Sequence, residues 1–262
     1  MTVAPPPTLP ATAARLLALC AEEEYSVSQL VRVIEADPAV ASRLLRLANS
    51  AYFGVSRQVE SLNRAVDLLG RMTVQALVLG HSLLGFWKGR AVPPAVEGLW
   101  THAYLCALGC RHLAQRLSRA PHLSAPETLF LTGLLHDIGK ILFLVQTPND
   151  YSVALDVLGD RESLLTWERD RFGDDHAEAG GSALEQWQLP FSIAAVVRYH
   201  HRQGLRAELQ ADWQVLRAVD GLAAGEEPGL LDTSLPGGLL ADLAGRMGKF
   251  GEEAREFYQV LQ

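Results

Sequence analysis

Cysteine is scarce in this sequence. Only three are present, Cys20, Cys106 and Cys110, and none has the spacing of a Cys-x-x-Cys metal or redox pair. Cys106 and Cys110 lie four residues apart, which favours two small core residues on one face of a helix over metal ligands or a disulfide. Reduced thiols are typical of the cytoplasm, where we expect the protein to be located.

Long apolar runs are missing as well. The sequence has no uninterrupted stretch of about 18 to 20 apolar residues, the length that a membrane span requires. Its first ten residues, MTVAPPPTLP, lack the basic-then-apolar order of a signal peptide and are expected to be loosely ordered. These two absences predict a protein without membrane association.

Positive charge is in deficit too. The formal net charge of -7 at pH 7 gives no overall electrostatic footprint for nucleic acid. A local basic set remains, but at helical spacings such a set is more typical of a solvated face or of an ion-pair surface between lobes. Nucleic-acid binding is therefore not favoured, although five residues leave it open: Arg43, Arg46, Arg57, Arg64 and Arg71.

Hydrophobic residues, in contrast, make up 48% of the 262 residues, which is enough to bury a large core. Almost every segment repeats its apolar residues with a period near 3.6, so the chain is predicted to be all-α. Ser26 and Gln29 form a capping box, and Asp37 precedes a proline at the first position of the next helix. Ser61 opens a further helix, which Gly70 is placed to end.

The best candidate boundary is KGRAVPPAVEG, residues 88–98, which contains two prolines and two glycines. A long amphipathic helix, WTHAYLCALGCRHLAQRL, begins after it at residue 100. We predict an N-terminal helical lobe over residues 1–92, packed on a second helical lobe over residues 93–262.

Polar groups interrupt the apolar segment GLLHDIGK, residues 133–140. Buried charges are costly unless they are paired or bind a metal, so His136 and Asp137 need partners. Gly139 would let the chain turn beside them. Five helices of the second lobe can bring the candidate residues to one point: His102, His136, Asp137, His176, His200, His201 and Asp220.

Neutral imidazoles and carboxylates are donors for divalent manganese, iron or zinc, and a carboxylate can bridge two such ions. The site would bind one or two such ions, and Asp137 is the candidate bridge if two are bound. Two metals would lower the pKa of a shared water and neutralise phosphoryl charge, as hydrolysis of a phosphoester requires. Lys140 lies on the same face as His136 if the helix continues, and it could hold a phosphate oxygen or the attacking water. Asp137 and Lys140 are therefore the candidate catalytic residues.

Other interpretations of these residues stay open. The polar groups could form a hydrogen-bonded network without metal. One of His200 and His201 could face the site while the other faces solvent, and Asp220 could be an exposed helix residue.

Several stretches resemble the HDOD domain family, and the first of them is specific to it: EADPAVASRLLRLANSAYFG (35–54), FLTGLLHDIGK (130–140) and FGDDHAEAGGSALEQWQLP (172–190). The second lobe is similar to the wider HD superfamily of metal-dependent phosphohydrolases, whose His, His-Asp and distant Asp match His102, His136-Asp137 and Asp220. The resemblance implies an all-helical fold in which an N-terminal bundle packs on an HD-like bundle.

The resemblance also implies a ligand set. His102, His136, Asp137 and Asp220 would form one metal position. His176 would serve a second with one or both of His200 and His201, as in the related HD-GYP phosphodiesterases. The segment HHRQGLRAEL contains no Gly-Tyr-Pro, which argues against cleavage of cyclic di-GMP.

Two classes of function follow from the resemblance. The first is a bacterial signalling or regulatory protein that binds a protein partner or a nucleotide, with Tyr52 and Phe53 of ANSAYFG as part of an interlobe or partner surface. The second is a metal-dependent phosphohydrolase that acts on a nucleotide, a cyclic dinucleotide or a nucleic-acid phosphodiester.

Overall fold

The computed structural model describes residues 5–20, 25–50, 55, 57–231 and 233–261. Within these ranges the regular secondary structure is entirely helical and no strand is present, which confirms the all-α prediction. Tyr52 and Phe53 lie outside the described residues.

The N-terminal third contains five α-helices followed by one turn of 3-10 helix. Their bounds are α1 Ala11–Cys20, α2 Val27–Glu35, α3 Pro38–Ala48, α4 Leu62–Leu69, α5 Arg71–Leu84 and η2 Gly85–Trp87. The predicted capping box at the start of α2 is confirmed, because Ser26 accepts from the backbone N–H of Gln29 and the Gln29 side chain accepts from that of Ser26.

Two further helix signals in this part are confirmed. The Asp37 side chain accepts from two backbone N–H groups at the start of α3, and that of Ser61 accepts from the backbone of Arg64 at the start of α4. Gly70 has a positive φ of 77° between α4 and α5. Its lack of a Cβ lets the chain change direction there and begin α5 at the next residue.

The remaining helices surround the candidate site. Their bounds are α6 Ala95–Arg116, α7 Pro126–Leu135, α8 Ile138–Gln146, α9 Pro148–Val157, α10 Arg161–Phe172, α11 His176–Gln186, α12 Phe191–Tyr199, η3 Ala207–Leu209, α13 Gln210–Ala223 and α14 Gly237–Leu261. The long helix expected from residue 100 therefore begins five residues earlier, directly after Pro94.

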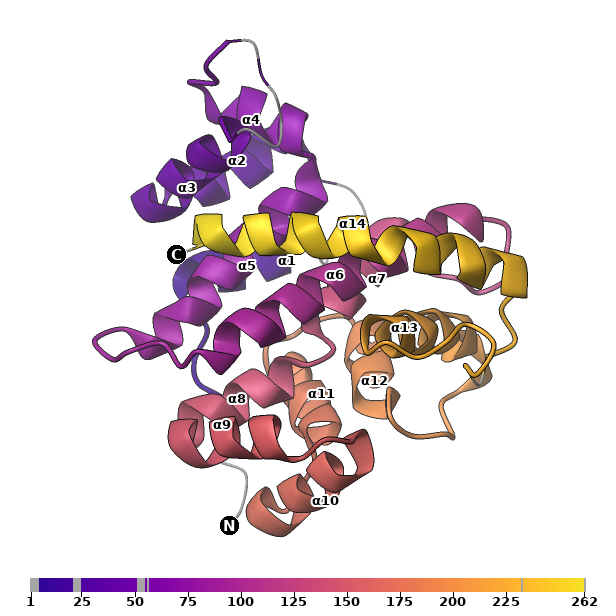
Figure 1. Ribbon diagram of the computed structural model, residues 1–262. Coiled ribbons are helices and arrows are strands. Elements are labelled where there is room, and N and C mark those ends of the chain that lie inside the picture. Colours follow the sequence, from indigo (N-terminus) through magenta and orange to yellow (C-terminus); the bar gives the residue numbers. More distant parts are fainter. Residues whose placement is uncertain (1–4, 21–24, 51–54, 56, 232, 262) are drawn as a thin grey trace.

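The C-terminal helix α14 crosses the molecule and lies over α5, α6 and α7 in Figure 1. It packs on α6 and also on α3 and α5 of the N-terminal third. The Phe257 ring stacks on that of Tyr104 with 4.1 Å between the ring centroids. The Arg43 guanidinium on α3 donates to the backbone carbonyls of Val260 and Leu261. Helix α14 thus joins the two parts of the chain, and the division at residues 92 and 93 stays a prediction.

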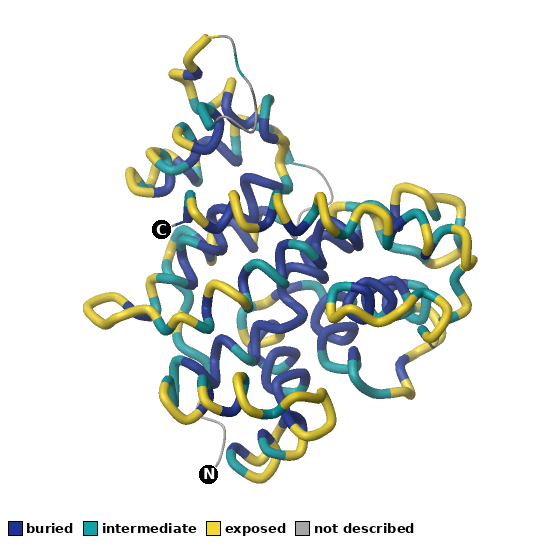
Figure 2. The backbone as a smooth tube through the Cα atoms, viewed as in Figure 1, coloured by how far each residue is buried: buried dark blue, intermediate teal, exposed yellow. Residues whose placement is uncertain are grey.

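Buried residues follow α5, α6, α7 and α8 through the middle of the molecule, while the outer helices and loops are more exposed (Figure 2). The stretch Pro126–Gln146, which contains α7 and α8, is long and apolar enough by length and composition to cross a membrane. The sequence had led us to expect no such stretch. In its most apolar window 83% of the residues are buried inside the protein, as is typical of a core helix.

Candidate metal centre

His136 and Asp137 lie at a break between two helices. Helix α7 ends at Leu135 and α8 begins at Ile138. The condition under which His136 and Lys140 would share a helical face is not met, because the helix does not continue: Asp137 leaves the helical conformation with ψ at 15°. Lys140 lies in the first turn of α8, and its Nζ donates to Asp137 Oδ2 at 2.7 Å. The break turns two adjacent polar side chains into the space between the surrounding helices.

Gly139 does not turn the chain, contrary to the sequence interpretation. It lies inside α8, where a Cβ would meet the backbone oxygen of His176 at 2.0 Å. The missing side chain lets α8 approach the start of α11 closely. This approach brings His176 beside Asp137.

The structure brings all seven candidate ligands together, although they come from widely separated parts of the chain. His102 lies on α6, His176 begins α11, His200 directly follows α12 and Asp220 lies on α13. His200 is 1% exposed and Asp220 is 7% exposed, so neither points into solvent. His201 also turns inward, since its Nε2 lies 3.0 Å from that of His176.

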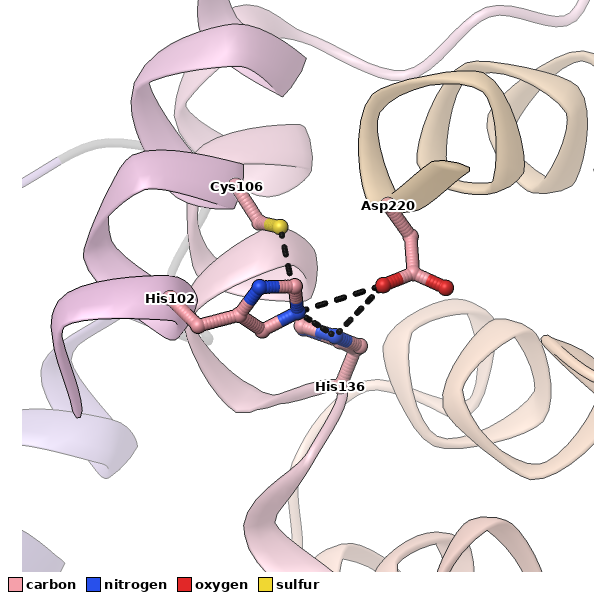
Figure 3. A group of neighbouring side chains, drawn as sticks. All are labelled: His102, Cys106, His136 and Asp220. Carbon is pink, nitrogen blue, oxygen red and sulfur yellow. Dashed lines mark hydrogen bonds and ion pairs between the residues drawn. The ribbon is translucent and has the colours of Figure 1, made fainter. Parts of the chain in front are cut away.

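One group of donors gathers around His102 (Figure 3). His102 Nε2 lies 3.3 Å from His136 Nε2 and 3.1 Å from Asp220 Oδ1. Cys106 Sγ lies 3.6 Å from His102 Nε2. The four ligand atoms of this group all lie within 4.8 Å of one another. The sequence favours a core residue over a metal ligand at Cys106 and so misses this contact, although its position one turn after His102 is a usable signal.

Asp137 faces two groups at once. Its Oδ2 lies 3.4 Å from His136 Nε2 and 3.7 Å from His102 Nε2. Its Oδ1 lies 3.3 Å from His176 Nε2 and 3.8 Å from His200 Nε2. Together with His201, these residues make a second group whose ligand atoms also lie within 4.8 Å of one another. The two groups therefore meet at one carboxylate.

Three of the imidazoles are oriented by hydrogen bonds from Nδ1, the ring nitrogen that points away from the cluster. Nδ1 of His136 lies 2.8 Å from the carbonyl of Gly133, and Nδ1 of His200 lies 2.5 Å from that of Val197. Nδ1 of His176 lies 2.7 Å from Glu168 Oε2. Because these oxygens only accept, each Nδ1 carries a proton, and Nε2 is the ring nitrogen that faces the cluster.

Glu168 is a functional candidate that the sequence did not indicate. It is completely buried on α10, and it accepts from the backbone N–H of His176 at 2.9 Å as well as from the ring. The Tyr151 hydroxyl donates to its other oxygen. Glu168 lies across the turn between α10 and α11 from His176, so no helical spacing connects the two residues.

The carboxylates of the cluster stay ionised although they are buried. Burial would raise the pKa of Asp137, but the charges of His136 and Lys140 hold that pKa well below its ordinary value. The pKa of Asp220 is likewise lowered against burial, chiefly by hydrogen bonds from His102 and His136. The Arg161 guanidinium at the start of α10 adds a contact of 3.0 Å to Asp220 Oδ2. The carboxylates of Asp137 and Asp220 are therefore both negatively charged within the group of imidazoles.

The cluster contains polar atoms that lack a partner. Among the described residues, Asp137 Oδ1 and His200 Nε2 are buried and make no hydrogen bond. Burial lowers the pKa of His200 to about 3, with further lowering from the charges of His136 and His176, so its imidazole is neutral. Each of these two atoms then directs a lone pair at the other ligand atoms of the cluster. This arrangement is costly unless a cation is bound among these ligand atoms.

The spacing of the donors fits a divalent cation. Metal–nitrogen and metal–oxygen bonds of about 2.0–2.2 Å in a tetrahedron require donor–donor separations of about 3.3–3.6 Å. Five of the six separations among His102, His136, Asp220 Oδ1 and Asp137 Oδ2 range from 3.1 to 3.7 Å. The donor types, their spacing and the unpartnered atoms together fit a metal.

A helical fold that gathers a histidine, a His-Asp pair and a distant aspartate matches the arrangement that the resemblance to the HD superfamily implies. The chain belongs to the HDOD domain family, whose pattern it matches over residues 7–203.

Individual proteins are also similar to this chain. An uncharacterised protein of Treponema pallidum (strain Nichols) is 25% identical over 200 residues, which cover 74% of this chain and 37% of that protein. The chain thus spans little more than a third of the length of this relative.

Two solved structures show the same fold. A candidate signal transduction protein from Marinobacter aquaeolei VT8 has a TM-score of 0.76 at 21% identity, covering 98% of this chain and 59% of that one. A candidate phosphohydrolase from Shewanella amazonensis SB2B has a TM-score of 0.67 at 22% identity, covering 98% and 95%. At these identities the likeness concerns the fold alone.

Proposed function

We propose that this HDOD protein is a regulatory protein that binds one or two divalent metal ions in its second helical lobe. The observation that carries the proposal is the pair of buried, unpartnered atoms, Asp137 Oδ1 and His200 Nε2, inside a cluster of oriented donors. Without metal, His200 Nε2 has no hydrogen bond and Asp137 Oδ1 has only its 3.3 Å contact with His176 Nε2, and a buried polar atom left unsatisfied costs about 1–3 kcal/mol.

The donors divide into two positions. The first ion would be held by His102, His136 and Asp220, together with Oδ2 of Asp137. The second would be held by Oδ1 of Asp137 with His176, His200 and His201. Manganese, iron and zinc all accept such a mixture of imidazole and carboxylate. Bound there, the metal would supply Lewis acidity and an acidified water.

The test of metal binding is elemental analysis of protein purified without chelator. We expect about one or two equivalents of metal in the wild type and a loss of metal in Asp137→Ala, because this carboxylate serves both positions. Removing it also leaves the Lys140 ammonium without its partner, which should destabilise the fold by about 3–5 kcal/mol. The matched control is Asp156→Asn, at an exposed residue on α9.

Equal metal content and equal melting temperatures in wild type and Asp137→Ala would overturn the assignment. Absence of metal from the wild type, even after incubation with manganese, iron and zinc in turn, would do the same. Either outcome would make the cluster a structural polar network.

The regulatory role is the part of the proposal that concerns partners. We propose that the protein acts by binding a signalling protein or a nucleotide, in keeping with its family resemblance. Nucleic acid is less favoured, because the net charge is -7 and two members of the basic set, Arg43 and Arg71, donate to backbone carbonyls within the chain. Metal binding in this role stabilises the site and its surroundings.

Hydrolysis of a phosphoester is the second candidate. It is favoured by two cations at the cluster, Lys140 against Asp137 and Arg161 against Asp220, since both could turn to a phosphate oxygen. Arg161 and His102 have side chains that are 38% and 24% exposed, so this edge is open to solvent. Metal-loaded protein should then cleave nucleotide or phosphodiester substrates, and Asp137→Ala should not. No turnover with fully loaded protein would leave only the regulatory role.

A further inference from the structure

Cys106 is unusual among the residues of the cluster because it is a thiol. It lies one turn after His102 on α6 and is fully buried. In Figure 3 its sulfur points toward the same space as His102, His136 and Asp220. These four ligand atoms lie within 4.8 Å of one another. The sulfur is thus a neighbour of the first metal position.

The distance from the sulfur fits coordination. Bonds of about 2.3 Å from zinc to sulfur and about 2.0–2.1 Å from zinc to nitrogen give a sulfur–nitrogen separation of about 3.6 Å in a tetrahedron. The separation between Cys106 Sγ and His102 Nε2 is 3.6 Å. That between the two imidazole nitrogens is 3.3 Å, close to the value expected for two nitrogens on one tetrahedral ion.

Cys110 provides a comparison within the same helix. It is the same residue type, one turn further along α6, and it is equally buried. Both cysteines belong to the apolar cluster of α6, α7, α12 and α13, but only Cys106 is also among the metal-ligand groups of the described residues. Core packing explains Cys110 fully, whereas it does not explain why the Cys106 sulfur faces two imidazoles and a carboxylate.

We propose that Cys106 is a fifth donor to the first metal position, beside His102, His136, Asp220 and Oδ2 of Asp137, and that its sulfur makes this position selective for zinc over manganese. The inference rests on the proposed function, because it requires that the site binds metal. Thiolate is a soft ligand that zinc accepts readily, whereas manganese prefers oxygen donors. The thiol proton leaves to solvent when the ion binds. The second position has no sulfur donor in its group and does not share this preference.

Cobalt(II) is the probe that tests this ligand, because a thiolate bound to cobalt(II) produces a charge-transfer band in the near ultraviolet. The experiment uses the full chain in a Cys20→Ser background, which removes the partly exposed thiol. We compare that protein with its Cys106→Ser and Cys110→Ser variants. Bound cobalt is measured by elemental analysis, and the fold is checked by circular dichroism.

The expected result is a band in the background protein and in Cys110→Ser, and no band in Cys106→Ser, with cobalt still bound in all three. Zinc affinity should fall by on the order of tenfold or more in Cys106→Ser, while manganese affinity changes by less than about twofold.

Other results would overturn the inference. Bound cobalt without a band in the background protein would show that Cys106 is not a ligand, while the proposed metal site stands. A band that disappears in Cys110→Ser and persists in Cys106→Ser would show that Cys110, and not Cys106, is the sulfur ligand. If no cobalt or zinc binds the background protein at all, the proposed function fails and the inference fails with it.

Discussion

A single carboxylate, that of Asp137, faces both groups of donors with a different oxygen. It is 4% exposed, so its charge is stabilised by neighbours rather than by water. Lys140 donates to Oδ2, while Oδ1 is left to the second group. This division of one side chain between two groups is the feature of the site that allows two ions to be neighbours.

Glu168 should control metal affinity without touching the metal. Its carboxylate accepts from Nδ1 of His176 and thereby directs Nε2 toward the cluster and makes it more basic. We expect Glu168→Gln to lower metal affinity by about 10–100-fold, measured by competition with a chelating dye. The control is Glu162→Gln on the same helix, where the side chain is 80% exposed. Equal affinities of Glu168→Gln and the wild type would contradict this role.

Asp212 should make the stability of the protein depend on pH. It is buried and accepts hydrogen bonds from the backbone N–H and the hydroxyl of Ser124. Burial raises the pKa of Asp212 above its ordinary value of 3.8, and the Ser124 hydrogen bonds only partly oppose this. The folded state therefore binds the proton more tightly, so this residue's stabilising contribution is complete below pH 3.8 and is lost as pH rises through the folded pKa.

In Asp212→Asn this decline should be absent, because the amide does not titrate. Urea unfolding of both proteins, with chelator present, gives the free energy of unfolding at a series of pH values. The free energy of the variant minus that of the wild type should increase as pH rises from 3.8. A difference that does not change with pH would contradict the prediction.

At the scale of elements, the approach of α8 to α11 determines the shape of the site. A methyl group on Gly139 would meet the backbone oxygen of His176 at 2.0 Å, and backbone cannot move aside as a flexible side chain can. We expect Gly139→Ala to destabilise the protein by about 1–3 kcal/mol and to reduce metal content, measured by urea unfolding and elemental analysis.

The matched control for this substitution is Gly245→Ala in α14. A Cβ at Gly245 meets nothing within 4 Å, and the residue is exposed in a helix interior. This variant should be more stable than the wild type by about 0.5–1 kcal/mol, because alanine restricts the unfolded chain. If both variants behaved alike, the close approach would not be what limits position 139.

Helix starts were the elements that the sequence predicted best. Ser26, Asp37 and Ser61 cap helices through hydrogen bonds to residues two or three positions along, so the signal is local. The break at His136 and Asp137 was harder to predict. It separates two strongly apolar helices, and its position depends on contacts with α6 and α11 that local sequence does not encode.

At the scale of the whole molecule, the C-terminal helix α14 packs on both parts of the chain. It packs on α3, α5 and α6, so residues 1–92 and residues 93–262 share part of their core. We predict that the two segments unfold in one transition, in which circular dichroism and tryptophan fluorescence change at the same urea concentration.

Phe257→Ala tests this coupling. The ring is 3% exposed and stacks on Tyr104, so its removal should cost about 3–5 kcal/mol. The whole transition should move to lower urea without splitting. Two separate transitions, in the wild type or in the variant, would contradict the prediction and favour lobes that fold independently.

The sequence by itself determined the helical class, the helix caps, the family and the identity of the seven candidate ligands, because these depend on local periodicity and on residue types in order. Only the tertiary structure decided that Asp137 divides its oxygens between two groups, that Glu168 supports His176, and that Cys106, unlike Cys110, is one of the clustered donors. These relations join helices far apart along the chain, and their distances arise from packing, which a pattern of residues along one helix does not contain.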